Sequence, residues 1–429
     1  MIRQPLRIAT TKQLERSVRA AGFEAFVAPE SINLDFHRSI EQRKADGPIM
    51  REFLERNRID LILDFNTELM TFVRVQGDTG PFALTNAVLG IPYVACYLDP
   101  ITSTMQQVAW EDHWQILESP DWIKWIPEIP HSAELLRMGI PNIVTMPMAA
   151  ANADFDTSPL PEVQNGPAVA FMGHPASSWF AAKQEIHSDQ MFAGFTAAAV
   201  NADMPHLPFH QIYYDLYQFA VPPAAEEDLR ARAQRSAEYY NQKFAYNAYL
   251  AVKQRDRFAT FLKRRLGDAF ELIGDHWEAL CGLKHTPRIW DMNLLHRRMR
   301  EVPICLNLVK GNMETGLIVR HYEITSHGGF MLTYDMGELA SQFVIGEECD
   351  VFRNEAELLD KIGFYLGNPQ KRREIAAAGQ KKTLSCHLYS HRIVNLVELL
   401  RQAGKLSRPA GVEAKSSLGN LSPELVEAT

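Results

Sequence analysis

The stretch GLIVRHYEITSHGGFMLT, residues 316–333, indicates how this chain folds. Its first part has the composition of a helix that begins near Gly316, and the glycine pair 328–329 would end that helix. The apolar run Phe330–Thr333 has the length of a buried strand, and a similar run, 302–309, precedes the stretch. Strand, helix and strand in this order predict a parallel α/β unit.

Two charged residues, Arg320 and Glu323, lie inside the predicted helix and are three positions apart. This spacing places both side chains on one face of the helix. They could form an exposed ion pair, which would contribute less than about 1 kcal/mol to stability, or they could point at a ligand. The spacing alone leaves both interpretations open.

The pattern continues towards the C-terminus. After Arg320-x-x-Glu323 and Gly328-Gly329 come, in order, Gly346-Glu347, Asn354-x-x-Glu357-Leu, Tyr365-Leu-x-Asn368-Pro369, Ala376–Gly379 and His387-x-Tyr389-x-His391-Arg392. Over residues 302–400 this ordered set resembles the CgeB-like glycosyltransferases, which have a glycosyl transferase group 1-like C-terminal domain. The resemblance implies the GT-B fold, an α/β fold in which two Rossmann-like parallel-sheet domains face a cleft. It also implies that the C-terminal domain binds a nucleotide-sugar donor.

Length and composition limit the possible classes of protein. A chain of 429 residues suits two or three domains, and 46% hydrophobic residues supply enough core for them. The net charge of −8 disfavours nonspecific nucleic-acid binding. No apolar run reaches the length of a membrane span, and the five cysteines have no metal-binding spacing. We therefore expect a cytoplasmic protein with reduced cysteines.

The alternation of strand and helix patterns predicts the domain boundaries. Residues 1–155 alternate regularly and would form an N-terminal Rossmann-like domain that binds the acceptor. No Gly-x-Gly-x-x-Gly pattern follows its first strand, so we expect no dinucleotide cofactor. Residues 167–387 would form the donor-binding domain, with a helical insertion at about 178–266. The resemblance implies that a helix at 388–404 crosses back to the N-terminal domain, and the tail 406–429 has a disordered composition.

In parallel α/β sheets, ligands bind outside the carboxyl ends of the strands, and Glu323 follows such a strand. One carboxylate can accept hydrogen bonds from two vicinal ribose hydroxyls, so Glu323 suits the ribose of a nucleotide. Related retaining transferases carry a second acid eight positions earlier, followed by glycine. Here these positions hold Thr315 and Gly316, so the glycine is present and the acid is absent. Glu314 is the neighbouring acid that could replace it.

The remaining donor-site candidates would bind the diphosphate and the base. Lys310 and Arg320 are the nearest cations, and free amides near Gly316 could also bind phosphate. Gly173, after the first strand of the second domain, would allow a phosphate to approach the backbone, or it could form an ordinary turn. Trp290 could stack on the base or lie in the core. Gly328 and Gly329 belong to the donor-binding part through the resemblance.

Asp99 and His174 are the catalytic candidates. Asp99 follows a strand of the first domain, where an inverting enzyme would need a general base, and Asp64, Asn66 and Glu68 are further candidates for that position. Each of these four residues could instead be a helix cap or a loop residue.

Histidines supply a second group of candidates. His174 and His327 flank the expected donor site and could contact the sugar, or they could be structural. The signature His387, Tyr389, His391 and Arg392 suits packing between domains as well as catalysis. No set of residues has the spacing of metal ligands, so we expect a metal-independent enzyme without a cofactor.

The sequence thus predicts a glycosyltransferase. It would move a sugar from a nucleoside-diphosphate sugar to a hydroxyl or amide of a glycan, protein or small molecule. A sugar-nucleotide epimerase of the same architecture and a non-catalytic nucleotide-sugar-binding or scaffold protein are alternatives, the latter because of Thr315. The tyrosines of the insertion, if exposed, would favour a homo-oligomer.

Overall fold

The computed structural model describes residues 5–32, 38–76, 79–99, 116–161, 166–181, 239–240, 243, 246–247, 250–309 and 313–406. Lys310, most of the expected helical insertion and the tail after residue 406 lie outside this part. The chain forms two compact units. Unit 1 comprises Met1–Ala153 and Leu388–Thr429, and unit 2 comprises Asp154–His387.

Unit 1 is built on a six-stranded sheet with the order β2-β1-β3-β6-β7-β8, in which all neighbours are parallel. The strands are β1 (Arg7–Thr10), β2 (Glu24–Val27), β3 (Leu61–Phe65), β6 (Tyr93–Cys96), β7 (Ile123–Ile126) and β8 (Ile143–Thr145). The helices are α1 (Lys12–Ala20), α2 (Ile40–Ala45), α3 (Gly47–Arg56), α4 (Thr85–Leu89) and α7 (Ile129–Arg137), and β4 (Phe72–Arg74) pairs with β5 (Phe82–Leu84) in a separate antiparallel hairpin. β3, β6 and β7 are buried along their whole length, as expected for parallel strands covered on both faces.

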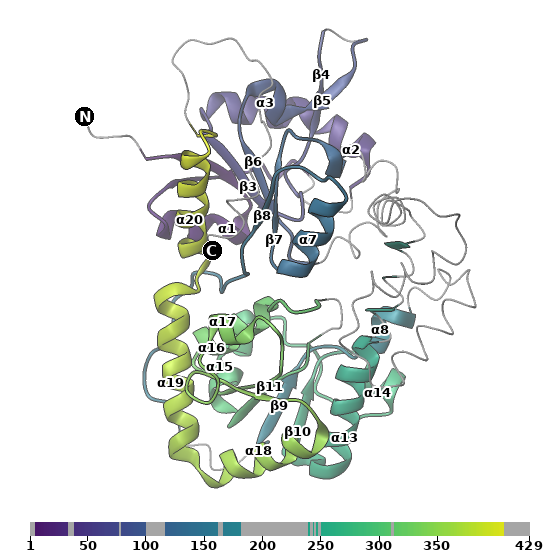
Figure 1. Cartoon of the computed structure of the whole chain (residues 1–429), viewed down its shortest axis with the longest axis vertical. Helices are drawn as coiled ribbons and strands as arrows, with labels where there is room; N and C mark the ends of the chain where they lie inside the picture. The colour runs from purple at the N-terminus through teal and green to yellow at the C-terminus, as the bar shows by residue number, and fades with distance from the viewer. Residues whose placement is uncertain are drawn as a thin grey trace. The chain divides into compact units, whose positions relative to one another are not determined.

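The last helix, α20 (Tyr389–Gln402), belongs to unit 1 although it lies at the far end of the chain (Figure 1). It packs beside α1 against one face of the sheet, and the ring of Tyr389 makes edge contacts with Phe65 and Trp125. The guanidinium of Arg392 donates hydrogen bonds to the carbonyls of Pro147 and Met148. The C-terminal helix is thus part of the core of unit 1.

Unit 2 contains a five-stranded parallel sheet with the order β10-β9-β11-β12-β13. The strands are β9 (Val169–Met172), β10 (Phe270–Ile273), β11 (Ile304–Asn307), β12 (Met331–Tyr334) and β13 (Asp350–Phe352). The helices are α8 (Ala176–Ala181), the π-helical turn η2 (Val252–Asp256), α13 (Arg257–Leu266), the 3-10 turn η3 (Gly267–Ala269), α14 (Trp277–Cys281), α15 (Met292–Glu301), α16 (Val319–Ser326), α17 (Leu339–Gln342), α18 (Glu355–Gly367) and α19 (Pro369–Cys386). Two parallel α/β units and a returning C-terminal helix confirm the GT-B class of fold.

Three local predictions from the sequence were wrong: a helix start near Gly316, a capping box of Thr10 with Gln13 before the first helix, and a helix end at Gly379. The helix expected near Gly316 begins at Val319, because the preceding residues are extended and Leu317 is buried. Thr11, not Thr10, precedes α1, and its side chain makes no capping hydrogen bond. Gly379 does not end a helix but lies within α19, where a Cβ would come within 2.2 Å of the carbonyl oxygen of Glu348. Glycine is required there for close packing.

Candidate active site

The carboxylate of Glu323 is the best-defined polar group in unit 2. It lies in the second turn of α16, and its Oε1 is 2.9 Å from Nε2 of His296 on α15. Its Oε2 is 2.7 Å from Nη1 of Arg320, one turn earlier on the same helix. The side chains of Glu323, His296 and Arg320 are 15%, 19% and 26% exposed, so all three reach the surface. The predicted pair of Arg320 and Glu323 therefore exists, with a histidine as an additional member.

The surroundings of Glu323 keep it ionised. Burial would by itself raise its pKa, but the hydrogen bond with His296 and the charge of Arg320 outweigh this effect, and the pKa is lowered. An ionised carboxylate has about four acceptor positions; the hydrogen bond with His296 takes one, and Arg320 forms an ion pair at the other oxygen. Glu323 can therefore accept two more hydrogen bonds.

His327 contacts both the ring of His296 and the backbone of Glu323. Its ring stacks on that of His296, with centroids 3.5 Å apart and an angle of 22° between the planes. Its Nδ1 is 2.9 Å from the main-chain oxygen of Glu323 and therefore donates a hydrogen bond to it. Burial and the nearby His296 lower the pKa of His327 to about 4, so its ring is neutral at neutral pH. His327 is only 8% exposed, so it is a support for Glu323 and not the sugar contact that the sequence suggested.

Thr315, which stands where related retaining transferases have an acid, has the carboxylate of Glu338 beside it. The hydroxyl of Thr315 donates a hydrogen bond of 2.7 Å to Glu338, and the amide of Glu338 donates one to the carbonyl of Thr315. Glu338 lies between β12 and α17. Glu314, the replacement considered from the sequence, instead pairs with Lys243 at 3.4 Å. Gly316 is buried just after these residues.

A buried arginine, Arg255, links the carboxyl ends of two strands. It donates hydrogen bonds to the carbonyl of His174 after β9 and to that of Leu308 after β11. Burial lowers its pKa to about 10, Asp256 raises it and Arg320 lowers it further, so the group stays protonated at neutral pH. Within the described part of the chain, Arg255 forms no ion pair with a carboxylate. It therefore contributes a positive charge to this edge of the sheet.

Gly173 and His174 lie at the carboxyl end of β9, as predicted. The amide of Gly173 donates to the carbonyl of Ile273, so this amide is already used within the sheet. A Cβ on Gly274 would lie 2.3 Å from the carbonyl oxygen of Gly173, so the close approach at this point is between two strand ends. Nδ1 of His174 accepts a hydrogen bond from the amide of Asp275, which leaves the proton on Nε2. Burial lowers the pKa of His174.

Gly328 and Gly329 end α16, as the sequence predicted, whereas the third remaining donor-site candidate, Trp290, lies where the sequence did not predict it. Gly328 and Gly329 close α16: their amides donate to carbonyls within that helix, and Gly328 has a φ of +79°. A Cβ on Gly329 would press against Ile324. These glycines therefore have a structural role before β12. Trp290 is neither in the core nor at a strand end: it precedes α15, is 73% exposed and stacks on the guanidinium of Arg288 at 3.9 Å.

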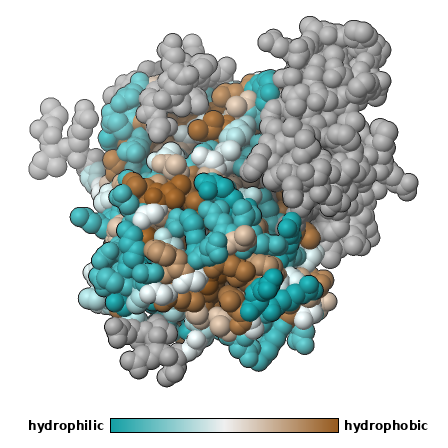
Figure 2. Space-filling view, turned by 60° about the horizontal axis from the view of Figure 1, so that its bottom comes forward, coloured by the Kyte–Doolittle hydropathy of each residue, from teal (hydrophilic) through white to brown (hydrophobic). Residues whose placement is uncertain are grey.

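Exposed hydrophobic residues accompany Trp290. Figure 2 shows hydrophobic residues between hydrophilic ones on the face of the molecule that it draws. Met292 and Leu294, on the first turn of α15, are 48% and 49% exposed. An aromatic ring and two apolar side chains therefore lie at the start of the helix that carries His296.

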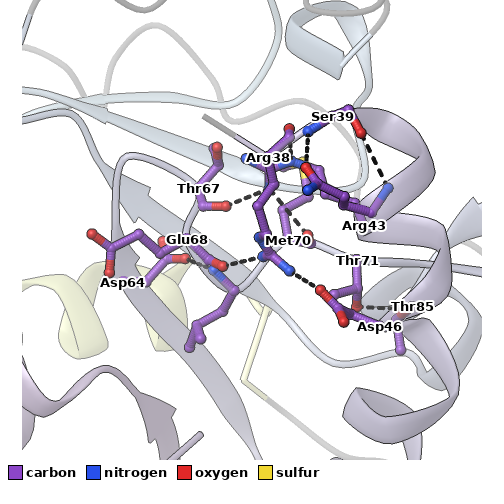
Figure 3. Close-up of polar contacts among 12 residues, drawn as sticks. Arg38, Ser39, Arg43, Asp46, Asp64, Thr67, Glu68, Met70, Thr71 and Thr85 are labelled. Carbon is purple, nitrogen blue, oxygen red and sulfur yellow. Dashed lines mark hydrogen bonds and ion pairs between the residues drawn. The ribbon is translucent and has the colours of Figure 1, made fainter. Parts of the chain in front are cut away.

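Two acceptor-side candidates of unit 1, Asp64 and Glu68, lie in the same polar region as Arg38, Arg43 and Asp46, which we call the sealed cluster (Figure 3). Asp64 is fully buried, with Oδ2 accepting hydrogen bonds from the amide of Leu69 and the hydroxyl of Tyr93. Its Oδ1 has no hydrogen-bond partner in the described chain. Burial raises the pKa of Asp64 well above its usual range, against the effect of the Leu69 amide. A fully buried acid of this kind is unsuited to contact a substrate directly.

Two buried arginines hold the loop that follows β3. Arg38 donates to the carbonyl of Glu68 and pairs with Asp46, whereas Arg43 donates to the carbonyls of Arg38, Thr67 and Met70. Figure 3 shows both guanidinium groups reaching this loop from one side. The described contacts of the two arginines are with backbone oxygens and, for Arg38, also with the carboxylate of Asp46.

The same loop is tied to the one that carries Asp99. Asn66 and Thr67 both have left-handed backbones, with φ of 48° and 63°, which is uncommon for residues other than glycine. The side-chain oxygen of Asn66 accepts a hydrogen bond from the amide of Leu98. Asp99 follows directly, half-buried after β6. The structure therefore brings Asn66 close to the loop that carries Asp99, whereas Asp64 is fully buried.

The C-terminal signature is structural where it is described. His387 hydrogen-bonds through Nε2 to the carbonyl of Gln342 in unit 2. His391 accepts a hydrogen bond from the amide of Leu388 at the start of α20. Tyr389 and Arg392 belong to the core contacts of unit 1 described above. These contacts fix the ends of the two helices, α19 and α20.

Residues 254–398 match a family described as Glycosyl transferase-like. The matched segment includes Arg255, His296, Arg320 and Glu323 and most of α20. No curated protein matches the chain. Among solved structures, a sucrose-phosphate synthase from Thermosynechococcus elongatus is similar at 12% identity and a TM-score of 0.45, covering 94% of this chain and 100% of that one. A glycosyltransferase from Rickettsia africae is similar at 8% identity and a TM-score of 0.44, with coverage of 94% and 100%.

Two features are absent from the described residues. These residues contain no helix that is long and apolar enough to span a membrane. Nor do they hold three or more His, Cys, Asp or Glu side chains grouped as a metal site would need.

Sequence reasoning missed His296, Arg255 and Glu338. His296 stands next to Leu295 in an ordinary amphipathic helix, and Arg255 and Glu338 lie in segments with no distinctive spacing. The pattern Arg320-x-x-Glu323 was the signal that could be found, because both members lie on one helix. The other three reach the site from elements that are separate in sequence.

Proposed function

We propose that this protein is a CgeB-like glycosyltransferase that transfers a sugar from a nucleoside-diphosphate sugar to a hydroxyl or amide acceptor. The observation that carries the proposal is Glu323, an ionised and partly exposed carboxylate oriented by His296 and Arg320. It lies within the segment that matches the glycosyltransferase-like family. In this proposal, Glu323 accepts hydrogen bonds from the two ribose hydroxyls of the donor.

The diphosphate would be bound by Arg320, by Lys310 and by the first amides of α16. Ile318 precedes this helix and offers no side-chain cap, and its carbonyl accepts a hydrogen bond from the amide of His321, so the amides of Val319 and Arg320 are the ones that would bind an anion. The buried charge of Arg255 adds to the positive potential at this edge. Trp290, exposed before α15, would stack on the base. These groups would stabilise the charge that develops on the departing diphosphate.

In the transfer, the acceptor oxygen or nitrogen forms a bond to the anomeric carbon of the sugar. The bond from that carbon to the diphosphate oxygen breaks, and the electron pair leaves with the diphosphate. The acceptor proton passes to a base, for which Asp99 is the candidate in an inverting reaction, or to the departing diphosphate in a retaining one. Nε2–H of His174 could donate a hydrogen bond to the sugar or phosphate. Glu338, next to Thr315, would contact sugar hydroxyls.

A nucleotide-sugar-binding protein without transfer activity is the second candidate. Thr315 favours it, because related retaining transferases have an acid at that position. Glu338, which supplies a carboxylate beside Thr315, weakens this argument.

The test is incubation with a panel of nucleoside-diphosphate sugars, followed by measurement of nucleoside diphosphate released. The proposal expects slow release in water from at least one donor and faster release when an extract containing acceptors is added. Glu323→Gln should reduce both rates. Binding without any release would favour the second candidate, and the absence of binding to every donor would contradict both.

A further inference from the structure

Three contacts in unit 2 form a closed loop around Glu323. Nε2 of His296 bonds to Oε1 of Glu323, the ring of His296 stacks on His327, and Nδ1 of His327 bonds to the main-chain oxygen of Glu323. His296 comes from α15, whereas the other two residues come from α16 and the turn that follows it. The side chain and the backbone of one residue are thus both held by a pair of stacked rings.

The bond from His296 sets the direction of the carboxylate. The last torsion of a glutamate side chain is broad, so an unsupported carboxylate samples many orientations. Here the hydrogen bond from His296 fixes the direction of Oε1, and the ion pair with Arg320 holds Oε2 on the side of the helix that carries both residues. The remaining lone pairs then point in fixed directions, which suits two neighbouring hydroxyls of one ring.

The neutral state of His327 suits its supporting role. A neutral ring can stack closely on His296 whether His296 is charged or not, whereas two charged rings would repel each other. The ring of Phe155 also packs against that of His327, with ring centroids 5.2 Å apart. Arg300 bonds to the carbonyl of His327 and adds a positive charge that disfavours its protonation. His327 is therefore a buried, uncharged ring on which the ring of His296 stacks.

We propose that His296 is a positioning residue for Glu323, and that its hydrogen bond makes the site prefer ribonucleoside diphosphates over their 2′-deoxy counterparts. This inference rests on the proposed function, in which Glu323 binds the ribose. A ligand without the 2′-hydroxyl leaves one oriented acceptor of Glu323 without its donor, and such unpaired groups are the usual source of strong discrimination. If the carboxylate were free to rotate, it could turn toward the hydroxyl that remains, and the preference for the ribose form would be smaller.

Two substitutions separate the hydrogen bond from the ring. His296→Phe keeps a ring that can stack on His327 but cannot donate to Glu323. His296→Gln keeps an N–H donor at the end of the side chain but has no ring. Asn293→Ala, an exposed change on the same helix, is the matched control. Thermal melting of each variant checks that it is folded.

The measurement is calorimetric titration with uridine, guanosine and adenosine diphosphates and with the 2′-deoxy form of whichever binds best. We expect the parent and Asn293→Ala to prefer the ribose form by roughly tenfold, as for a hydrogen bond to a charged group. His296→Phe should reduce this preference to about threefold or less, and His296→Gln should retain most of it.

Three results would count against these ideas in different ways. If folded His296→Phe keeps the full preference and His296→Gln loses it, the ring matters and the positioning role is wrong. If both variants match the parent while Glu323→Gln loses the preference, Glu323 needs no support and the inference fails alone. If the parent binds none of the diphosphates, the proposed function itself fails.

Discussion

Each unit of this protein combines an acid with nearby arginines, but the two arrangements differ in what the charges contact. In unit 1, Asp64 is fully buried and bonds to the Leu69 amide and the Tyr93 hydroxyl, and Arg43 bonds to backbone carbonyls. In unit 2, Glu323 is 15% exposed, and its partners are the side chains of His296 and Arg320. In unit 1 the polar groups form hydrogen bonds within the chain, whereas in unit 2 the carboxylate of Glu323 keeps acceptor positions for a ligand.

The pKa values of the two acids reflect this difference. Burial dominates at Asp64 and raises its pKa, because within the described residues the only side chain that bonds to it is the neutral Tyr93 hydroxyl and no cation forms an ion pair with it. At Glu323 the effect of burial is outweighed by His296 and Arg320, and the pKa is lowered. An acid near arginine is therefore not by itself a sign of a binding site. Partial exposure together with an oriented, ionised carboxylate is the more informative combination.

The largest effect on stability should come from the arginine of the sealed cluster. Arg43→Met removes the donor to three buried carbonyls, so we expect a loss of about 3 kcal/mol or more in the free energy of unfolding. The affinity of the folded variant for nucleoside diphosphates should not change. Urea denaturation and titration measure the two quantities. The exposed Arg51→Met is the control and should change stability by less than about 0.5 kcal/mol. A near-neutral Arg43→Met would mean that the loop after β3 does not depend on it.

The two acids should have opposite effects on the pH dependence of stability. The pKa of Asp64 is higher in the folded state than in the unfolded state, so its ionisation costs the parent stability as pH rises from near 4. Asp64→Asn should therefore gain stability relative to the parent as pH increases, by about 1.4 kcal/mol per unit of pKa difference. Thermal melts of both proteins from pH 5 to 8 test this. A difference that is constant with pH would contradict the raised pKa.

At Glu323 the sign is reversed. Its folded pKa lies below the unfolded value, so its stabilising contribution is present above about pH 4.5 and is lost as pH falls through the folded pKa. Glu323→Gln should therefore be least stable relative to the parent near neutral pH, and the two should converge in acid. If the gap widened in acid, His296 and Arg320 would not be the partners that stabilise the ionised form.

Trp290 offers the smallest effect on stability and a selective effect on binding. It is 73% exposed, so Trp290→Ala should leave the free energy of unfolding within about 0.5 kcal/mol of the parent. If it stacks on the base, its loss should weaken nucleotide binding by roughly 1–3 kcal/mol, as at other base-stacking positions. Titration with a nucleoside diphosphate measures this, and Leu294→Ala, at a 49% exposed position on α15, is the control. Equal affinity of Trp290→Ala and the parent would remove Trp290 from the site.

Where the decisive contacts are local, the sequence was a reliable guide. Helix α20, Tyr389–Gln402, lies within the predicted range 388–404, and its apolar positions recur at helical spacing. The strands were placed from apolar runs: β12 (Met331–Tyr334) overlaps the predicted strand Phe330–Thr333, and β11 (Ile304–Asn307) lies within the run 302–309. Arg320 and Glu323 were placed correctly on one face of a helix, because a spacing of three residues fixes their separation, and of the two interpretations left open the structure shows the ion pair.

Contacts between distant segments were beyond the sequence. His296 meets Glu323 across two helices, and Glu338 meets Thr315 across β12. Gly379 was misread because a glycine required for close packing against Glu348 has the same identity as one that ends a helix. Trp290 was misread because most tryptophans are largely buried, and nothing in its flanking residues indicates its exposure.

The central claim is that Glu323 binds the ribose of a nucleotide, and calorimetric titration of Glu323→Gln with the best-binding nucleoside diphosphate tests it most directly. Gln is nearly isosteric but lacks the charge and one acceptor oxygen, and Glu374→Gln on the exposed face of α19 is the matched control. We predict binding at least about tenfold weaker than in the parent for Glu323→Gln and unchanged for Glu374→Gln. Equal affinity of the parent and Glu323→Gln, with both proteins folded, would contradict the account.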